Sequence, residues 1–206
     1  MYLTRIALDT RRRDTMRAIA FPSKFHGALE SAFPGDRPHN LWRLDSLNGK
    51  LYLLLLSDTE PELTSFCKQF SEYPDAWETR SYDGLLERLT VGSRWRFRLT
   101  ANPTRSVGSG RQGVRGTVHA HITAEHQRQW LAERAEKHGF RLEGFDVVQS
   151  RWLRFYKKNG RPVTLLSVTY EGLLEVTDPA LFRAAMTNGI GRGKAYGLGL
   201  LTVVRG

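Results

Sequence analysis

Apolar and polar positions along the first half of the chain follow two kinds of pattern, the two-residue alternation of a strand and the three-to-four-residue spacing of a helix. Strand-like runs are separated by segments whose apolar residues recur at helical spacing. The dipeptide Asn48-Gly49 lies between two of the strand-like runs and favours a tight hairpin turn. The predicted order is β-α-β-β-α-β, with strands at residues 1–9, 41–47, 50–57 and 77–82 and helices at residues 23–33 and 61–70.

The second half repeats this order of elements. In residues 94–101 the alternation places three apolar side chains on one face and Arg94, Arg96 and Arg98 on the other. Asp178 is the predicted N-cap of the last helix. The predicted strands are residues 94–101, 145–157, 162–175 and 198–206, and the predicted helices are residues 124–139 and 178–189. The pattern therefore predicts an α+β fold of two tandem ferredoxin-like (βαββαβ) domains, residues 1–88 and 89–206.

The excess positive charge is confined to the second domain. Residues 1–87 hold 11 Lys and Arg against 13 Asp and Glu, a net charge of −2, whereas residues 88–206 hold 20 against 8, a net charge of +12. Arginine makes up 24 of the 31 basic residues, and its planar guanidinium suits phosphate and base-edge contacts. A charge of one sign over long windows predicts a polyanionic partner, most often nucleic acid.

Other features exclude several classes of protein. Cys67 is the single cysteine, so neither a disulfide framework nor a cysteine-based zinc site is expected, and its apolar neighbours predict a buried thiol. The apolar run at residues 51–56 is too short to span a bilayer, and an Asp interrupts any signal-like N-terminus. We therefore expect a cytoplasmic protein without membrane contact.

A glycine-rich stretch lies between the last predicted helix and the last strand. Residues 188–199, NGIGRGKAYGLG, include five glycines together with Arg192 and Lys194. It lacks the order of a Walker motif, and it follows a helix where a dinucleotide fingerprint would follow a strand. Two interpretations stay open: a backbone that approaches an anion closely, with Arg192 and Lys194 as RNA-binding residues, or a tight connection that requires glycine.

The stretch GIGRGKAYGLGLL, after a tandem ferredoxin-like pattern, resembles the repeat-associated RNA-processing proteins of CRISPR systems. With a helix carrying His26 and an Arg/Lys-rich hairpin, the chain resembles the CasE family, the Type I-E repeat endoribonucleases of the Cascade complex. The resemblance implies cleavage of a CRISPR repeat stem-loop at the base of its stem without metal or cofactor, leaving 2′,3′-cyclic phosphate and 5′-hydroxyl ends. It implies pre-crRNA, crRNA and other Cascade subunits as partners.

His26 is the candidate proton-transfer residue. Imidazole titrates near neutral pH, so it can take the proton of an attacking 2′-hydroxyl or protonate a leaving 5′-oxygen. From the residues alone a surface histidine on a helix is the more common case, and the resemblance reverses that preference. Some members of the family carry a tyrosine three residues before this histidine, where this chain has Ser23. Ser23 and Lys24 are the candidates to orient the phosphate instead.

Basic residues on the long predicted hairpin are the candidates to hold the RNA. A-form RNA hides its base edges, so phosphate contacts and shape should dominate. Ser150 is added because it resembles a residue near the scissile phosphate in the family. Trp152 and Tyr156 could stack on bases, but packing in the core is the expected use of large aromatic side chains in a strand. The candidates are Ser150, Arg151, Arg154, Lys157, Lys158 and Arg161, with Arg94, Arg96 and Arg98 as a second surface.

The remaining histidines predict no metal site. His119 and His121 lie on one side of a possible strand, but no carboxylate or thiol accompanies them at ligand spacing. His39, His126 and His138 are expected at the surface or at helix ends. Residues 102–116, with four Gly and three Arg, predict a mobile loop, a composition that also suits a loop ordered by RNA.

Two alternatives to a nuclease fit part of the sequence. A non-catalytic RNA-binding subunit of a CRISPR ribonucleoprotein would share the hairpin and the glycine-rich stretch, with His26 incidental. A ribosome-associated structural protein fits the charge but not the nearly neutral first domain.

Overall fold

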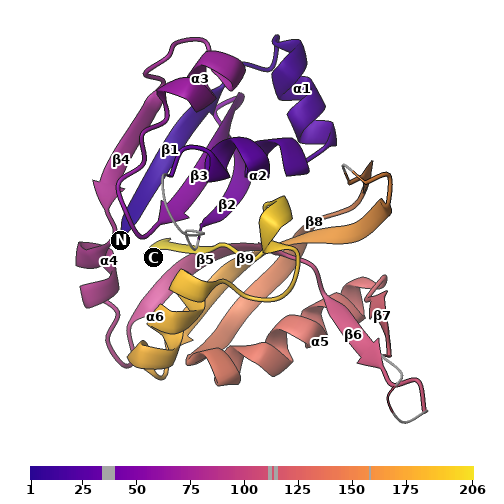
Figure 1. Ribbon diagram of the computed structural model, residues 1–206. Coiled ribbons are helices and arrows are strands. Elements are labelled where there is room, and N and C mark those ends of the chain that lie inside the picture. The colour runs from indigo at the N-terminus through magenta and orange to yellow at the C-terminus, as the bar shows by residue number, and fades with distance from the viewer. Residues whose placement is uncertain (34–39, 111–112, 114–115, 158) are drawn as a thin grey trace.

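The first domain is a four-stranded antiparallel sheet with helices on one face. The computed structural model describes the chain except for residues 34–39, 111–112, 114–115 and 158. The strands lie in the order β2-β3-β1-β4, and α1, α2 and α3 cover one face (Figure 1). The elements are β1 (Tyr2–Leu8), α1 (Arg13–Ala20), α2 (Ser23–Glu30), β2 (Leu41–Leu47), β3 (Lys50–Ser57), α3 (Thr64–Phe70) and β4 (Trp77–Ser81).

The second domain repeats this topology after the short helix α4. Its sheet has the order β10-β5-β9-β8, again antiparallel, with α5 and α6 on one face (Figure 1). In both sheets the first and third strands of the unit are central. The elements are α4 (Asp83–Glu87), β5 (Arg94–Ala101), β6 (Thr104–Val107), β7 (Thr117–Ala120), α5 (Ala124–Ala135), η1 (Glu136–His138), β8 (Phe140–Tyr156), β9 (Pro162–Val176), α6 (Pro179–Asn188), η2 (Lys194–Tyr196) and β10 (Leu201–Arg205). The prediction of two tandem ferredoxin-like domains is confirmed.

Apolar alternation explains where each sheet packs. Trp95, Phe97 and Leu99 on β5 are buried against the α5–α6 layer, as the alternation predicts, and the arginines between them face the other side. In the first domain Phe25 of α2 packs on Phe66 and Phe70 of α3. Cys67 of α3 is buried as predicted, and burial raises the pKa of its thiol.

Several element predictions need correction. The sequence pattern gave no helix at α1, because only Thr15 and Ala18 of this arginine-rich helix are buried. Helix α3 begins at Thr64 and not at the predicted Pro61, and the backbone N–H and the hydroxyl of Thr64 both donate to Glu62 just before the helix. Residues 102–116 are partly strand, since β6 pairs with β7 in a hairpin that projects from the body of the molecule (Figure 1).

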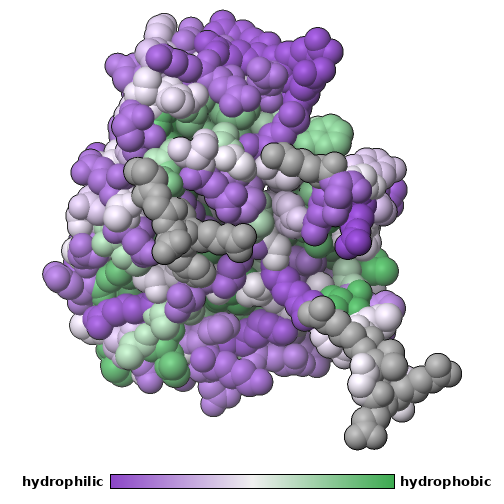
Figure 2. All heavy atoms as spheres, in the orientation of Figure 1, coloured by the Kyte–Doolittle hydropathy of each residue, from purple (hydrophilic) through white to green (hydrophobic). Residues whose placement is uncertain are grey.

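The two domains share part of one core. Leu41 and Leu56 of the first sheet belong to the same buried cluster as Trp95 and Phe182 of the second domain. The face of the molecule in Figure 2 is largely hydrophilic, with small separated apolar areas. None of the described helices is long and apolar enough to cross a membrane.

Candidate nucleic-acid interface

Helix α2 presents its polar side to solvent. Phe25 and Leu29 are buried one turn apart, which anchors the helix on the first sheet and turns His26 outward. The side chain of His26 is 36% exposed, and its Nε2 lies 3.2 Å from Oε1 of Glu30, one turn further along. Ser23 is half-buried and Lys24 is exposed. Because Ser23 and His26 are three residues apart, they share one side of the helix.

The glycine-rich stretch packs directly against the first domain. Its η2 segment contacts α2 and β2. Gly197 has φ +78°, and a Cβ there would lie 2.6 Å from the ring of Trp42 on β2. This close approach supports the interpretation of a tight connection that requires glycine. Arg192 is nevertheless exposed, and Lys194, the first residue of η2, is half-buried. The RNA-binding role of these two residues stays a prediction.

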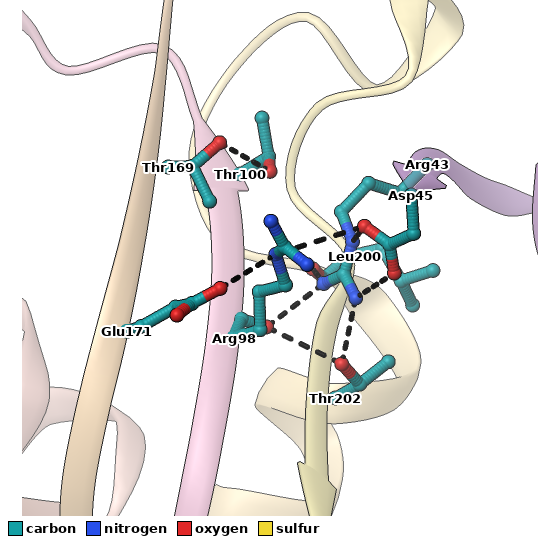
Figure 3. Close-up of polar contacts among 8 residues, drawn as sticks. All are labelled: Arg43, Asp45, Arg98, Thr100, Thr169, Glu171, Leu200 and Thr202. Carbon is teal, nitrogen blue, oxygen red and sulfur yellow. Dashed lines mark hydrogen bonds and ion pairs between the residues drawn. The ribbon is translucent and has the colours of Figure 1, made fainter. Parts of the chain in front are cut away.

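A buried arginine joins the domains at this junction. Arg43 of β2 is 2% exposed, and Figure 3 shows its guanidinium between β2, β5 and β10. Its Nη1 donates to the carbonyl oxygens of Arg98 (2.8 Å) and Leu200 (2.9 Å). Nε and Nη2 donate to the carboxylate of Asp45 at 2.9 and 2.7 Å, and Nη2 also donates to Thr202 at 2.8 Å. All five N–H groups of the guanidinium are therefore satisfied.

Sequence reasoning did not identify Arg43. The available signal was the pair Arg43 and Asp45, two residues apart and therefore on one face of the predicted strand. The fully satisfied guanidinium on the domain boundary ties β2 of the first sheet to β5 and β10 of the second.

A groove runs between the domains beside this junction. It encloses about 410 Å³, and its walls include Ile19 of α1, Leu44 of β2 and Arg151 of β8. A smaller adjoining cavity is lined by Pro22, the residue before α2, together with Arg151 and Tyr196. The structure therefore brings the start of α2, the glycine-rich stretch and the basic strand β8 together.

The β8–β9 hairpin divides its predicted RNA-binding residues between two faces. Residues opposite each other across the strand pair share a face, and neighbours along the strand alternate. Arg151 lies on the side of the interdomain groove, as does Phe155, whose ring meets Tyr196 edge-to-face at 4.9 Å. Ser150 and Arg154 lie on the opposite face. Arg154, Lys157 and Arg161 are exposed, and Lys158 lies outside the described residues.

The arginines of β5 are less available than the sequence suggested. Arg94 lies 3.0 Å from Glu143, and Arg98 lies 3.0 Å from Glu171 and 3.7 Å from Asp45. Arg96 is exposed at the edge of a cavity on the same sheet face. Ion pairs with protein carboxylates compete with phosphate, so of the three, Arg96 is the best placed to contact RNA.

The described residues contain no cluster of three or more His, Cys, Asp and Glu side chains that could hold a metal ion. The rings of His121 and His126 lie 5.8 Å apart at the start of α5. Burial, with a smaller contribution from His126, lowers the pKa of His121. His119 is exposed on β7, where its ring nitrogen contacts the Thr117 hydroxyl at 2.9 Å.

Comparisons with known proteins cover nearly the whole chain. The sequence model of one family, described as CRISPR associated protein, matches residues 1–205. The CRISPR-associated endoribonuclease Cse3 of Thermus thermophilus is 31% identical over 98% of this chain and 99% of the relative. Among solved structures, Cse3 bound to a 19-nucleotide RNA superposes with TM-score 0.83 at 30% identity, covering 99% of this chain and 100% of that one. Thermus thermophilus Cse3 bound to an RNA representing a pre-cleavage complex gives TM-score 0.81 at 30% identity, with 98% of each chain covered.

A chain of a CRISPR RNA-guided surveillance complex, in a pre-nicking state, is also similar. It is 26% identical, and the match covers 100% of both chains with TM-score 0.74.

Proposed function

The chain belongs to the CRISPR associated protein family, and on this premise we propose that it is an endoribonuclease that processes CRISPR precursor RNA. It is homologous over nearly its full length to Cse3, an endoribonuclease with structures bound to RNA, one of which represents a pre-cleavage complex. Its substrate is the repeat stem-loop, cut at the base of the stem. The observation that carries the proposal is the meeting of α2, the glycine-rich stretch and the basic strand β8 at one junction.

The reaction needs proton transfer and charge stabilisation. The 2′-oxygen attacks the neighbouring phosphorus and loses its proton, while the 5′-oxygen leaves and gains one. The products are a 2′,3′-cyclic phosphate and a 5′-hydroxyl. His26 carries one of these proton transfers, since its half-buried imidazole lies on the solvent side of α2 and imidazole is a usual group for general acid–base catalysis. Ser23, one turn before it, and Lys24 are placed to orient the phosphate.

Contacts to the RNA backbone come from the hairpin. Arg151 lines the groove with Ile19 of α1 and the smaller cavity with Pro22, the residue before α2, so it can hold a phosphate near the start of this helix. Lys157 and Arg161 stand at the exposed tip of the hairpin, where they can enter the groove of a stem. No metal ion is required by this chemistry. The product crRNA stays bound within the Cascade assembly, and the cytoplasm is the proposed location.

Replacing His26 with Ala tests the catalytic assignment. We expect cleavage of a repeat stem-loop in EDTA to slow by ~10²- to 10⁴-fold, the usual contribution of a proton-transfer residue, while RNA binding is kept. His119→Ala is the matched control, because that histidine is exposed on β7. Undiminished cleavage by His26→Ala in EDTA would show that the catalytic assignment of His26 is wrong.

A further inference from the structure

Two large aromatic side chains on β8 are exposed, which corrects the expectation that they pack in the core. Trp152 is 43% exposed and Tyr156 is 65% exposed. By contrast, Trp42, Trp95 and Trp130 are 2 to 6% exposed. The core therefore makes little use of the Trp152 and Tyr156 rings, and their exposed surface needs another explanation.

The register of the hairpin places both rings on one face with a cation between them. Trp152 is opposite Leu166, Arg154 is opposite Thr164 and Tyr156 is opposite Pro162. This face is the one that bears Ser150, and it points away from the interdomain groove. We call Trp152, Arg154 and Tyr156 the outer face of the hairpin. Trp152 and Tyr156 are four residues apart, so at about 3.3 Å per residue their Cα atoms are about 13 Å apart.

The charge around the outer face favours an anionic partner. Residues 147–170 contain no acidic side chain. Among the described residues, no carboxylate forms an ion pair with Arg154, whereas Arg94 and Arg98 on β5 are both paired. An aromatic–arginine–aromatic row without acids combines stacking surfaces with phosphate neutralisation, which is how single-stranded nucleic acid is bound.

We propose that the outer face of the β8–β9 hairpin binds unpaired nucleotides that flank the RNA stem. The bases of a stem are stacked inside the duplex and cannot reach protein rings, whereas unpaired bases can stack on Trp152 and Tyr156. Arg154 contacts the phosphate between them. The inference rests on the proposed function, because it assumes a bound stem. One strand then serves two purposes: its inner face holds the cleavage junction and its outer face holds the flank.

The experiment compares two RNAs, a blunt stem-loop and the same stem-loop with a single-stranded flank. For the native protein we expect the flank to tighten binding, measured by fluorescence anisotropy. Trp152→Ala and Tyr156→Ala should each remove part of this gain, by roughly 5- to 150-fold per stacked base, and should leave the affinity for the blunt stem unchanged. Trp152→Phe and Tyr156→Phe, which keep a ring, should retain most of the gain.

A control variant at another exposed tyrosine and a measurement of tryptophan fluorescence complete the test. Tyr73 in the first domain is 61% exposed, and Tyr73→Ala should change neither affinity. Quenching of tryptophan fluorescence by the flanked RNA should be smaller in Trp152→Phe than in the native protein, because the most exposed tryptophan is gone.

Three outcomes distinguish failure of this inference from failure of the proposed function. If the native protein binds the two RNAs equally but still cuts the stem, the inference is wrong and the proposed function survives. If the alanine variants bind both RNAs normally but no longer join the Cascade subunits, the face is a protein-docking surface and the inference is overturned. If the native protein binds neither RNA, the proposed function itself fails.

Discussion

At the residue scale, a guanidinium with five donors and five matching acceptors links the two domains. Arg43 takes two backbone carbonyls, one hydroxyl and both oxygens of Asp45, which is itself only 15% exposed. A charge removed from water in this way is stable only while its partners remain, because each lost acceptor leaves a buried unpaired group. The same geometry cannot be reproduced by an ammonium, which is a compact point charge with three donors.

Replacing Arg43 with Met is therefore expected to lower the free energy of unfolding by about 3–5 kcal/mol, the usual cost of breaking a buried ion pair. Arg43→Lys should recover part of this loss, since it keeps the charge but not the fork. Urea denaturation measures both. Arg11→Met is the control, because Arg11 also pairs with an aspartate but is 74% exposed. A loss no larger than that of Arg11→Met would contradict the role of Arg43 as the joint between the sheets.

At the element scale, the glycine-rich stretch supplies a contact surface for the first domain. Its η2 segment contacts α2 and β2, and Gly197 lies under the ring of Trp42. The position of α2, and so of His26, depends on how closely this backbone approaches the first sheet. The stretch could therefore affect cleavage without itself touching RNA.

Gly197→Ala should be destabilising for two separable reasons. The φ of +78° is unfavourable for alanine, at ~1–2 kcal/mol, and the new Cβ would overlap the Trp42 ring. Gly49→Ala isolates the first cost, because Gly49 has φ +74° with nothing within 4 Å of its added Cβ. We expect Gly197→Ala to lower the melting temperature more than Gly49→Ala and to slow cleavage, whereas Gly49→Ala leaves the rate unchanged. Equal effects on the melting temperature would show that the Trp42 ring can move away from the new Cβ without lowering stability.

Element prediction from the sequence succeeded where a local rule determined the structure. Asp178 caps α6 by accepting from the N–H groups of Ala180 and Leu181, and this motif is visible in the sequence. The sequence did not predict helix α1, because this helix is buried by contacts with α2 and α3 and has no long apolar stripe. The exposure of Trp152 was also missed, since alternation shows which residues share a face but not whether another element covers that face.

At the scale of the whole molecule, the cationic second domain is not uniformly available to RNA. The net charge of +12 on residues 88–206 counts arginines that already have partners. Arg94 contacts Glu143, Arg128 contacts Asp146 and Arg141 contacts Glu175. These pairs lie on β5, α5 and the first part of β8, whereas the distal part of the β8–β9 hairpin carries no acid. The field that attracts RNA is thus concentrated on the hairpin, although the charge excess extends over the whole domain.

Salt dependence distinguishes the hairpin cations from the paired ones. Each phosphate neutralised by the protein releases counterions, so the logarithm of the binding constant falls by about 0.7 to 0.9 per contact for each tenfold rise in salt. Arg154→Ala should lower this slope by roughly one, and Lys157→Ala should act in the same way. Arg94→Ala should lower it by less, because Arg94 already neutralises Glu143. Binding constants for the repeat stem-loop with its single-stranded flank, over a salt series, would measure the three slopes. If Arg94→Ala lowers the slope as much as Arg154→Ala, β5 contacts RNA directly and its ion pairs exchange for phosphate on binding.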